Sequence, residues 1–353
     1  MWAVATVAGL AGAVLTVGLV TLTGNLGLGV SDGSLDRATL PAVSQPASTA
    51  APNDSTDDIV ALVAPAVVRL EVRRNGARSD GSGVVFRADG YLLTSRRLVH
   101  DADAIAVTLA DGRELPGDLV CDDPVTDLGV VRVDADDLPV AVVGTTADLR
   151  IGEPAVCVAA GDDGPAVLPG TVSSLGQRLG NVDGRTLHGL VETDTPLPRS
   201  SAGGALVNGR GTLIGLATAV GSADQDDPST APTGHGYATP IDMAREVGDE
   251  IIMVGRAVHP WLGIEGLDLD AETAGQMGID GGTGVQVVAA TGPASAGGLE
   301  PEDVIVAFAG QPVDSMTTLV SALMVHDPGT EVVVDYLRDG LAGQRTVILG
   351  ERR

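Results

Sequence analysis

Short apolar runs separated by Gly, Asp and Pro recur between residues 57 and 255. Short runs of this length, rich in Val, Leu and Ile and bounded by turn residues, are typical of β-strands. We therefore predict an all-β barrel or sandwich over 57–255. The runs lie at 67–72, 83–86, 105–109, 128–133, 155–159 and 213–217.

The segment Ile241–Val254 breaks this pattern, because its apolar residues recur at helical intervals. We expect a helix there that closes the first domain. Residues 256–350 predict a second, smaller domain with Gly-rich turns. Its expected strands lie near 284–289, 303–309 and 331–337, and its expected helix covers 315–325.

The first 31 residues carry no charge, and residues 2–22 are apolar apart from threonine and glycine. About 20 apolar residues are needed to cross a bilayer, so residues 1–23 predict a transmembrane anchor. A cleaved signal peptide is the alternative, although its basic leading segment is absent. Residues 24–56 are rich in Ser, Ala, Thr, Pro and Asp and predict a disordered linker.

The composition limits the kinds of binding partner that we expect, and it leaves two states open for the cysteines. The chain has 47 acidic and 21 basic residues and a formal charge of −26, and every basic residue is arginine. This balance argues against nucleic acid or anionic lipid as a partner. Cys121 and Cys157 could form a disulfide or remain buried thiols. His188, His235 and His259 are most simply surface or packing residues, so we expect no metal and no cofactor.

Five segments, in order, resemble the HtrA family of serine proteases. The resemblance covers nearly all of the chain from residue 57 onward. The segments are Gly81-Ser82-Gly83-Val84-Val85, Asp89-Gly90-Tyr91-Leu92-Leu93-Thr94, Asp123-Pro124-Val125-Thr126-Asp127-Leu128, Glu192-Thr193-Asp194 and Gly234-His235-Gly236-Tyr237-Ala238-Thr239-Pro240-Ile241.

The resemblance implies a chymotrypsin-like double β-barrel followed by a PDZ domain, so the expected fold is dominated by β-structure after an N-terminal transmembrane helix. It implies a protein at the cell membrane, spanning it once, with extracytoplasmic domains and a role in protein quality control. Relatives often trimerise, so a homo-oligomer is a possible state.

The catalytic positions depart from the family pattern. The position of the general-base histidine holds Arg97, whose guanidinium stays protonated and cannot accept a proton. The orienting aspartate is retained as Asp127. The nucleophile position holds Ala202, which has no hydroxyl, and the oxyanion-loop glycine and its preceding proline are replaced by Ser200 and Arg199. These changes predict a protease homologue without hydrolytic activity.

Two further readings of this region stay open. Ser201 and His100 lie next to the altered positions and could form a shifted catalytic pair, although an error of about 1 Å in such a site costs roughly a hundredfold in rate. Asp127 could instead form a salt bridge with Arg97 that stabilises the inactive site. The chain would then be an inactive homologue, an active endopeptidase with a shifted site, or a chaperone-like holdase.

The second domain carries a candidate peptide site. Trp261-Leu262-Gly263-Ile264 resembles the carboxylate-binding loop of an HtrA-type PDZ domain, and Gly292-Pro293-Ala294-Ser295-Ala296-Gly297-Gly298-Leu299 resembles another of its motifs. Backbone N–H groups around Gly263 would bind the carboxylate of a peptide or protein C-terminus, and the following strand would pair with the ligand. Leu319 and Leu323 would line an apolar pocket, or they would only complete the domain core.

Overall fold

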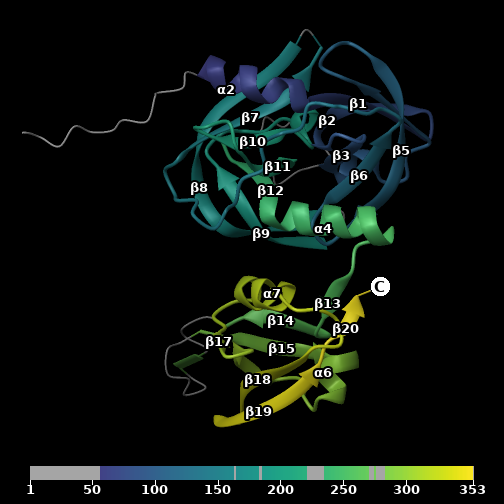
Figure 1. Ribbon diagram of the computed structural model, residues 1–353. Coiled ribbons are helices and arrows are strands. Elements are labelled where there is room, and N and C mark those ends of the chain that lie inside the picture. The colour runs from purple at the N-terminus through teal and green to yellow at the C-terminus, as the bar shows by residue number, and fades with distance from the viewer. Residues whose placement is uncertain are drawn as a thin grey trace, which may run out of the picture. The chain divides into compact units, whose positions relative to one another are not determined.

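The computed structural model describes residues 56–162, 164–182, 185–220, 234–269, 274–275 and 283–352 (Figure 1). The predicted membrane anchor and all of the predicted linker except Thr56 lie outside the described residues. Within the described part of the chain, no helix is long and apolar enough to cross a membrane.

The first domain contains two closed antiparallel barrels. In the first barrel the strands follow the order β1-β2-β3-β6-β5-β4, and β1 closes the ring by pairing with β4. All six apolar runs predicted for this domain lie on strands of one barrel or the other. The strands of the first barrel are β1 (Val67–Arg74), β2 (Ala77–Arg87), β3 (Tyr91–Ser95), β4 (Ala104–Thr108), β5 (Glu114–Asp123) and β6 (Leu128–Val133).

The second barrel has the order β10-β11-β12-β9-β8-β7 and closes between β7 and β10. The pattern of apolar runs did not predict β8, the longest strand, because its Gly and Pro residues interrupt the alternation. The strands are β7 (Pro154–Gly161), β8 (Gly164–Val182), β9 (Arg185–Thr193), β10 (Ala205–Asn208), β11 (Leu213–Val220) and β12 (Gly236–Pro240).

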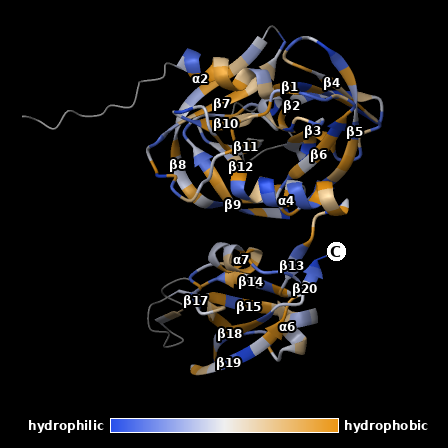
Figure 2. Cartoon of the chain, in the orientation of Figure 1, coloured by the Kyte–Doolittle hydropathy of each residue, from blue (hydrophilic) through white to orange (hydrophobic). Residues whose placement is uncertain are grey.

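Helices join the two barrels along a shared apolar seam. Helix α4 (Ile241–Val254) confirms the predicted helix and ends at Gly255, whose φ of 82° allows the left-handed turn. Figure 2 shows blue and orange residues alternating along it, as expected for one buried face. Its buried Ile251 packs in one cluster with Leu93 of the first barrel and Val156 of the second, and Ile59 of α2 (Thr56–Val63) joins this cluster.

Among its described residues, the second domain contains a six-stranded sheet, a two-stranded sheet of β13 and β20, and the helices α6 (Gly292–Ala296) and α7 (Met316–Met324). The main path through the sheet is β14-β15-β16-β18-β19, so β14 is an edge strand. The predicted strands and helix of this domain are all confirmed. The strands are β13 (His259–Trp261), β14 (Ile264–Asp268), β15 (Val285–Ala290), β16 (Val304–Phe308), β17 (Gln311–Pro312), β18 (Glu331–Arg338), β19 (Leu341–Ile348) and β20 (Gly350–Arg352).

Both cysteines are free thiols. Cys157 is buried on β7, and Cys121 is partly buried on β5. Burial raises the pKa of the Cys157 thiol to about 12. Of the two alternatives from the sequence, the structure therefore contains unpaired thiols and no disulfide between these residues.

Candidate functional site

The loop between β5 and β6 delivers Asp127 to the site. Asp123 begins the loop and its carboxylate accepts hydrogen bonds from the backbone N–H groups of Val125 (3.2 Å) and Thr126 (3.0 Å) and from the Thr126 hydroxyl. The imidazole of His259 lies 2.9 Å from the same carboxylate. These contacts hold the loop in a turn in which Asp127 has a φ of 58°, a left-handed conformation that aspartate tolerates.

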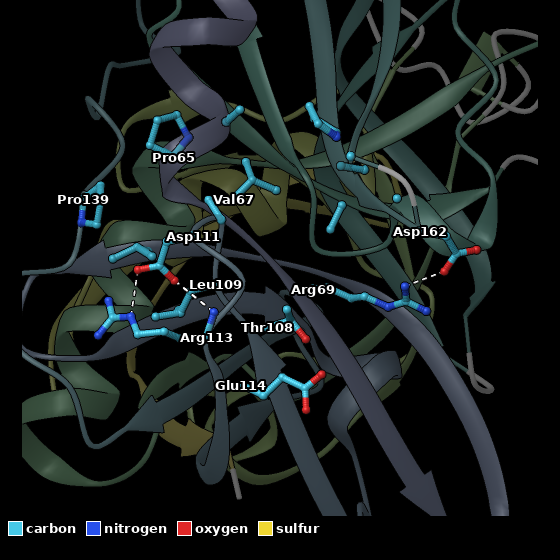
Figure 3. Close-up of a pocket in the computed structure, with 18 of the residues that line it drawn as sticks. Pro65, Val67, Arg69, Thr108, Leu109, Asp111, Arg113, Glu114, Pro139 and Asp162 are labelled. Carbon is cyan, nitrogen blue, oxygen red and sulfur yellow. Dashed lines mark hydrogen bonds and ion pairs between the residues drawn. The ribbon is translucent and has the colours of Figure 1, made fainter.

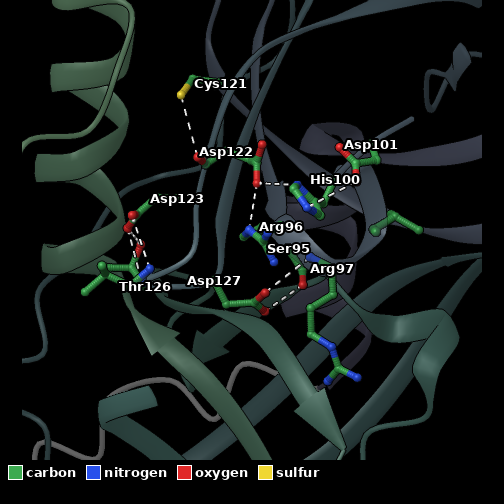
Figure 4. Close-up of polar contacts among 12 residues, drawn as sticks. Ser95, Arg96, Arg97, His100, Asp101, Cys121, Asp122, Asp123, Thr126 and Asp127 are labelled. Atoms are coloured by element: carbon green, nitrogen blue, oxygen red, sulfur yellow. Dashed lines mark hydrogen bonds and ion pairs between the residues drawn. The ribbon is translucent and has the colours of Figure 1, made fainter. Parts of the chain in front are cut away.

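The Asp127 carboxyl is buried and fully hydrogen-bonded. Its Oδ2 accepts the Ser95 hydroxyl at 2.7 Å and the Thr218 hydroxyl, and its Oδ1 accepts the Arg97 backbone N–H at 3.2 Å (Figure 4). Asp127 is only 3% exposed to solvent. Burial disfavours the charged form and raises the pKa of Asp127 to about 6, although these hydrogen bonds and the Arg97 charge act in the opposite direction.

Arg97 contacts Asp127 through its backbone. It lies in the short helix α3 (Arg96–Val99), and Figure 4 shows its side chain extending away from the Asp127 carboxyl. The guanidinium of Arg74 donates to the carbonyls of Arg97 (3.2 Å) and Leu98 (3.0 Å) and so binds the C-terminal end of α3. The backbone N–H of Arg97 is thus one of the donors to the Asp127 carboxylate, and the Arg97 charge lowers the pKa of that carboxyl. A carboxylate–guanidinium salt bridge between the two residues stays a prediction.

The loop at the nucleophile position forms one turn of 3₁₀ helix, η2 (Arg199–Ser201), followed by Ala202. The Ala202 N–H donates to the Arg199 carbonyl at 3.1 Å. In a serine protease this N–H, together with the one two residues earlier, stabilises the negatively charged oxygen of the reaction intermediate. In this chain the Ala202 N–H has an acceptor within its own loop.

The rest of this loop is held tightly. The Ser82 N–H donates to the Ala202 carbonyl at 2.8 Å, and the Gly203 N–H donates to the Ala217 carbonyl at 2.6 Å. Gly203 has a φ of 79°, and a Cβ there would overlap the Ser82 carbonyl oxygen. Gly203 is therefore required for the close approach of β2 to the loop, whereas a Cβ on Gly204 would approach Ser201 and Val158 of β7. Both close approaches are structural needs independent of catalysis.

The side chains of Ser201 and His100 each have contacts elsewhere. The Ser201 residue is 1% exposed, and its hydroxyl donates to the Pro198 carbonyl at 2.7 Å. His100 follows α3, and its Nδ1 lies 3.0 Å from Asp122 (Figure 4). Its Nε2 lies 3.4 Å from Asp101. The described contacts thus give the two side chains different partners, a backbone carbonyl for Ser201 and carboxylates for His100.

The sequence did not predict the two hydroxyls that surround Asp127. Ser95 ends β3 and Thr218 lies on β11, 91 residues from Asp127. Ser95 stands in the sequence two residues before Arg97, so the resemblance in that segment could have drawn attention to it. Thr218 carries no local signal, because only the packing of one barrel against the other brings it to the carboxyl.

In the second domain the Trp261–Ile264 segment has the geometry of a donor loop. Gly263 has a φ of 87°, and its carbonyl accepts the Thr291 N–H at 2.7 Å while the Leu262 carbonyl accepts the Ala294 N–H at 2.8 Å. These bonds tie the loop carbonyls to the start of α6. Among the described turn and loop hydrogen bonds, none is donated by the N–H of Leu262 or Gly263. Both N–H groups are thus suited to donate hydrogen bonds to the carboxylate of a ligand.

The aromatic and aliphatic residues named for this site pack inside the domain. A Cβ on Gly292 would lie 2.5 Å from the Trp261 ring, so this ring covers the start of α6. Leu319 and Leu323 belong to one buried cluster with Leu262, and Ile264 packs against that cluster. These leucines complete the core and also lie behind the loop.

A separate cavity of about 780 Å³ opens beside β1 and the β4–β5 turn (Figure 3). Its middle is lined by apolar side chains such as Val67 and Leu109, and its arginines are paired, Arg113 with Asp111 and Arg69 with Asp162. None of the candidate catalytic residues lines it. No group of three or more His, Cys, Asp or Glu side chains suited to a metal ion occurs in the described ranges.

Comparison with known families gives two matches along the chain. A trypsin-like peptidase domain matches residues 81–216, and a PDZ domain matches residues 260–349. The serine endoprotease DegS of Salmonella typhimurium is 31% identical over 91% of this chain and 95% of its own length. This chain belongs to the HtrA-type family of trypsin-like serine proteases with a PDZ domain.

Other relatives agree with this assignment. The serine protease PepD of Mycobacterium tuberculosis is 30% identical over 90% of this chain and 70% of its own length. A probable periplasmic DegP-like endoprotease of Pseudomonas fluorescens is 32% identical over 76% of this chain, and the chain spans about half (55%) of the length of that relative. The homologues of this chain are thus periplasmic or extracytoplasmic proteases.

Solved structures match the fold over most of the chain. The HtrA-type protease AlgW with a tripeptide has a TM-score of 0.74 at 33% identity and covers 85% of this chain and 98% of its own. AlgW with a decapeptide has a TM-score of 0.70 at 31% identity with the same coverage of this chain. The double barrel followed by a PDZ domain is therefore the shared architecture.

Proposed function

We propose that this chain is a proteolytically inactive HtrA-type protein whose PDZ domain binds peptide or protein C-termini. In this proposal residues 1–23 anchor it in the membrane, and the extracytoplasmic domains have a scaffold or regulatory role in protein quality control. The observation that carries the proposal is the state of the nucleophile loop. Ala202 has no attacking group, and its N–H is bonded to the Arg199 carbonyl.

Three parts of the catalytic machinery are altered together. Hydrolysis needs a nucleophile, a base to take its proton and donors for the oxyanion. Ala202 supplies no nucleophile and Arg97 no base, and one of the two oxyanion donors has an internal partner. Removal of the serine or the histidine alone from a catalytic triad costs about 10⁶ in rate. The retained Asp127 then serves to hold the Ser95 and Thr218 hydroxyls and the start of α3 in place.

Peptide binding needs none of these groups. Backbone N–H groups of the Leu262–Gly263 loop would bind a terminal carboxylate, and the edge strand β14 would pair with the ligand backbone. The solved AlgW structures carry a tripeptide or a decapeptide, which supports peptide binding for this chain by similarity. Homo-oligomers, which the family resemblance implies, are part of the proposal and are measurable by light scattering.

The test combines a serine-reactive fluorophosphonate probe with a casein digestion assay on the purified full chain in mild detergent. We expect no labelling and no cleavage. The matched variants are Ala202→Ser and the double variant Ala202→Ser/Arg97→His, which restore the nucleophile alone or with its base. Ala202→Ser should stay unlabelled, because it still lacks a base and its N–H is bonded to Arg199.

Other outcomes would favour the other readings of the chain. Labelling of the unaltered protein that Ser201→Ala abolishes would establish an endopeptidase with a shifted site, with His100 as the base to test next. Suppression of casein aggregation without cleavage, unchanged by a blocking C-terminal peptide, would favour a holdase. Carboxylate-dependent binding of C-terminal peptides without cleavage is the result that we expect.

A further inference from the structure

The cavity beside β1 is enclosed by both barrels and has an apolar wall. Its volume of about 780 Å³ lies within the range of about 300–1,000 Å³ that is usual for ligand sites. The buried side chains of Val67 and Leu109 form part of the wall (Figure 3). Around them the exposed residues Pro65, Pro139 and Pro165 form part of the rim. The cavity can therefore hold the aliphatic side chains of an extended segment.

The charges of the cavity favour a cation. Its arginines already have carboxylate partners in the pairs Arg113–Asp111 (2.7 Å), Arg78–Glu71 (2.6 Å) and Arg69–Asp162. Glu114, which pairs with Thr108 across β4 and β5, is a further carboxylate of the wall. The described contacts include no hydrogen bond or ion pair to the Glu114 carboxylate, and Figure 3 draws none. Among the described lining residues, negative charge is therefore in excess, and Glu114 can accept a basic group.

One end of the cavity adjoins the loop at the nucleophile position. Ala160 lines the cavity, and its backbone N–H donates to the Ser82 hydroxyl at 2.9 Å. The Ser82 N–H in turn donates to the Ala202 carbonyl at 2.8 Å. A polypeptide held in the cavity would therefore lie close to Ala202, which has no group that could attack it.

We propose that this cavity binds an extended polypeptide segment in which a lysine or arginine is flanked by aliphatic residues. The basic side chain pairs with Glu114, and its aliphatic neighbours contact Val67, Leu109 and the prolines of the rim. The segment is internal to its own chain, so this site needs no C-terminal carboxylate and goes beyond the binding proposed for the PDZ domain. The formal charge of −26 on the whole protein attracts such a basic segment from a distance.

The test uses two fluorescein-labelled peptides with amidated C-termini and fluorescence anisotropy on the full chain in mild detergent, with micelles alone as the blank. The peptides are Gly-Ser-Leu-Val-Lys-Val-Leu-Ser-Gly and the same sequence with Gln in place of Lys. An ion pair at a surface contributes up to about fivefold in affinity. We expect Glu114→Gln to lower the preference for the lysine peptide by about threefold or more, and high salt to lower it in the unaltered protein.

Matched variants separate the cavity from the general charge of the chain. Glu246→Gln removes a charge from the exposed side of α4, outside the cavity, and should leave the preference unchanged. Ala110→Trp adds a large side chain at an exposed position of the cavity wall and should weaken both peptides by about tenfold or more. Ala147→Trp, exposed outside the cavity in the same domain, should weaken neither. Circular dichroism checks that each variant is folded.

Three results would overturn the proposal. If Glu114→Gln and Glu246→Gln lower the preference equally, the lysine responds only to the overall charge. If Ala110→Trp and Ala147→Trp weaken binding equally, the peptides bind outside the cavity. If neither peptide binds and Ala110→Trp dissociates an oligomer in light scattering, a second copy of the chain covers the cavity. Each result leaves the proposed binding of C-termini untouched, because amidated peptides lack the carboxylate on which that binding depends.

Discussion

The buried carboxyl of Asp127 makes the stability of the first domain depend on pH in a predictable direction. Its pKa is about 6 in the folded protein against an ordinary value of 3.8, with burial as the main cause. The replacement Asp127→Asn keeps the shape and removes the charge. The amide nitrogen can take the place of Oδ2, because the hydroxyls of Ser95 and Thr218 can accept as well as donate.

The size of the effect follows from the two pKa values. A raised pKa means that the folded state favours the protonated carboxyl, so its stabilisation is complete below about pH 3.8 and is lost as the pH rises through about 6. The difference of about 2 units corresponds to about 3 kcal/mol. Between about pH 4.5 and pH 7.5 roughly 2 kcal/mol of this loss should be seen.

Urea unfolding at a series of pH values measures this effect. Far-ultraviolet circular dichroism follows both domains, and in a Trp2→Phe background the fluorescence of Trp261 follows the second domain as an internal reference. We compare the free energy of unfolding of Asp127→Asn with that of the unaltered protein, because the difference cancels the titration of all other groups. The free energy of unfolding of Asp127→Asn, taken relative to that of the unaltered protein, should therefore rise by about 2 kcal/mol from about pH 4.5 to pH 7.5.

A control on β5, the strand before the Asp127 loop, sharpens the result. Asp118 is exposed on β5, so Asp118→Asn removes one charge without a buried partner, and its difference from the unaltered protein should stay nearly constant with pH. The free energy of unfolding of Asp127→Asn relative to the unaltered protein could also be constant, or it could fall as the pH rises. Either result would mean that the Asp127 carboxyl ionises in the folded protein without loss of stability. The reasoning from burial would then be refuted.

Three further predictions concern the buried thiols and the tightly packed loop around Ala202. Because burial raises the pKa of Cys157 to about 12 and also raises that of Cys121, iodoacetamide at about pH 8 should leave Cys157 unmodified in the folded chain and alkylate both thiols in urea, as read by mass spectrometry. Gly203→Ala should cost at least about 2 kcal/mol, since it adds strain and overlap, whereas Gly209→Ala, with 3.8 Å to its nearest neighbour, should cost less than about 1 kcal/mol. Ser201→Ala should lose about 1 kcal/mol with its hydrogen bond and leave casein cleavage at background, and a fall in cleavage would contradict the inactive assignment.

The apolar runs located six of the twelve barrel strands, and helical spacing located α4. Runs such as 128–133 form strands, and the helical spacing of Ile241–Val254 predicted α4 to the residue. The same pattern failed for β8, where Gly and Pro interrupt it. That strand exists because β7 and β9 pair with it on either side, and such pairing outweighs weak local preference.

The sequence alone determined that Ala202 has no hydroxyl and that Arg97 carries a permanent positive charge, because these are properties of the residues themselves. Their assignment to the nucleophile and base positions rests on the resemblance to the family. The tertiary structure decided how those positions are used. The bond from the Ala202 N–H to Arg199 depends on the backbone path of the loop, and the meeting of Thr218 with Asp127 depends on the packing of the two barrels. Residue identity limits the chemistry of each group, but long-range contacts decide which partner that group meets.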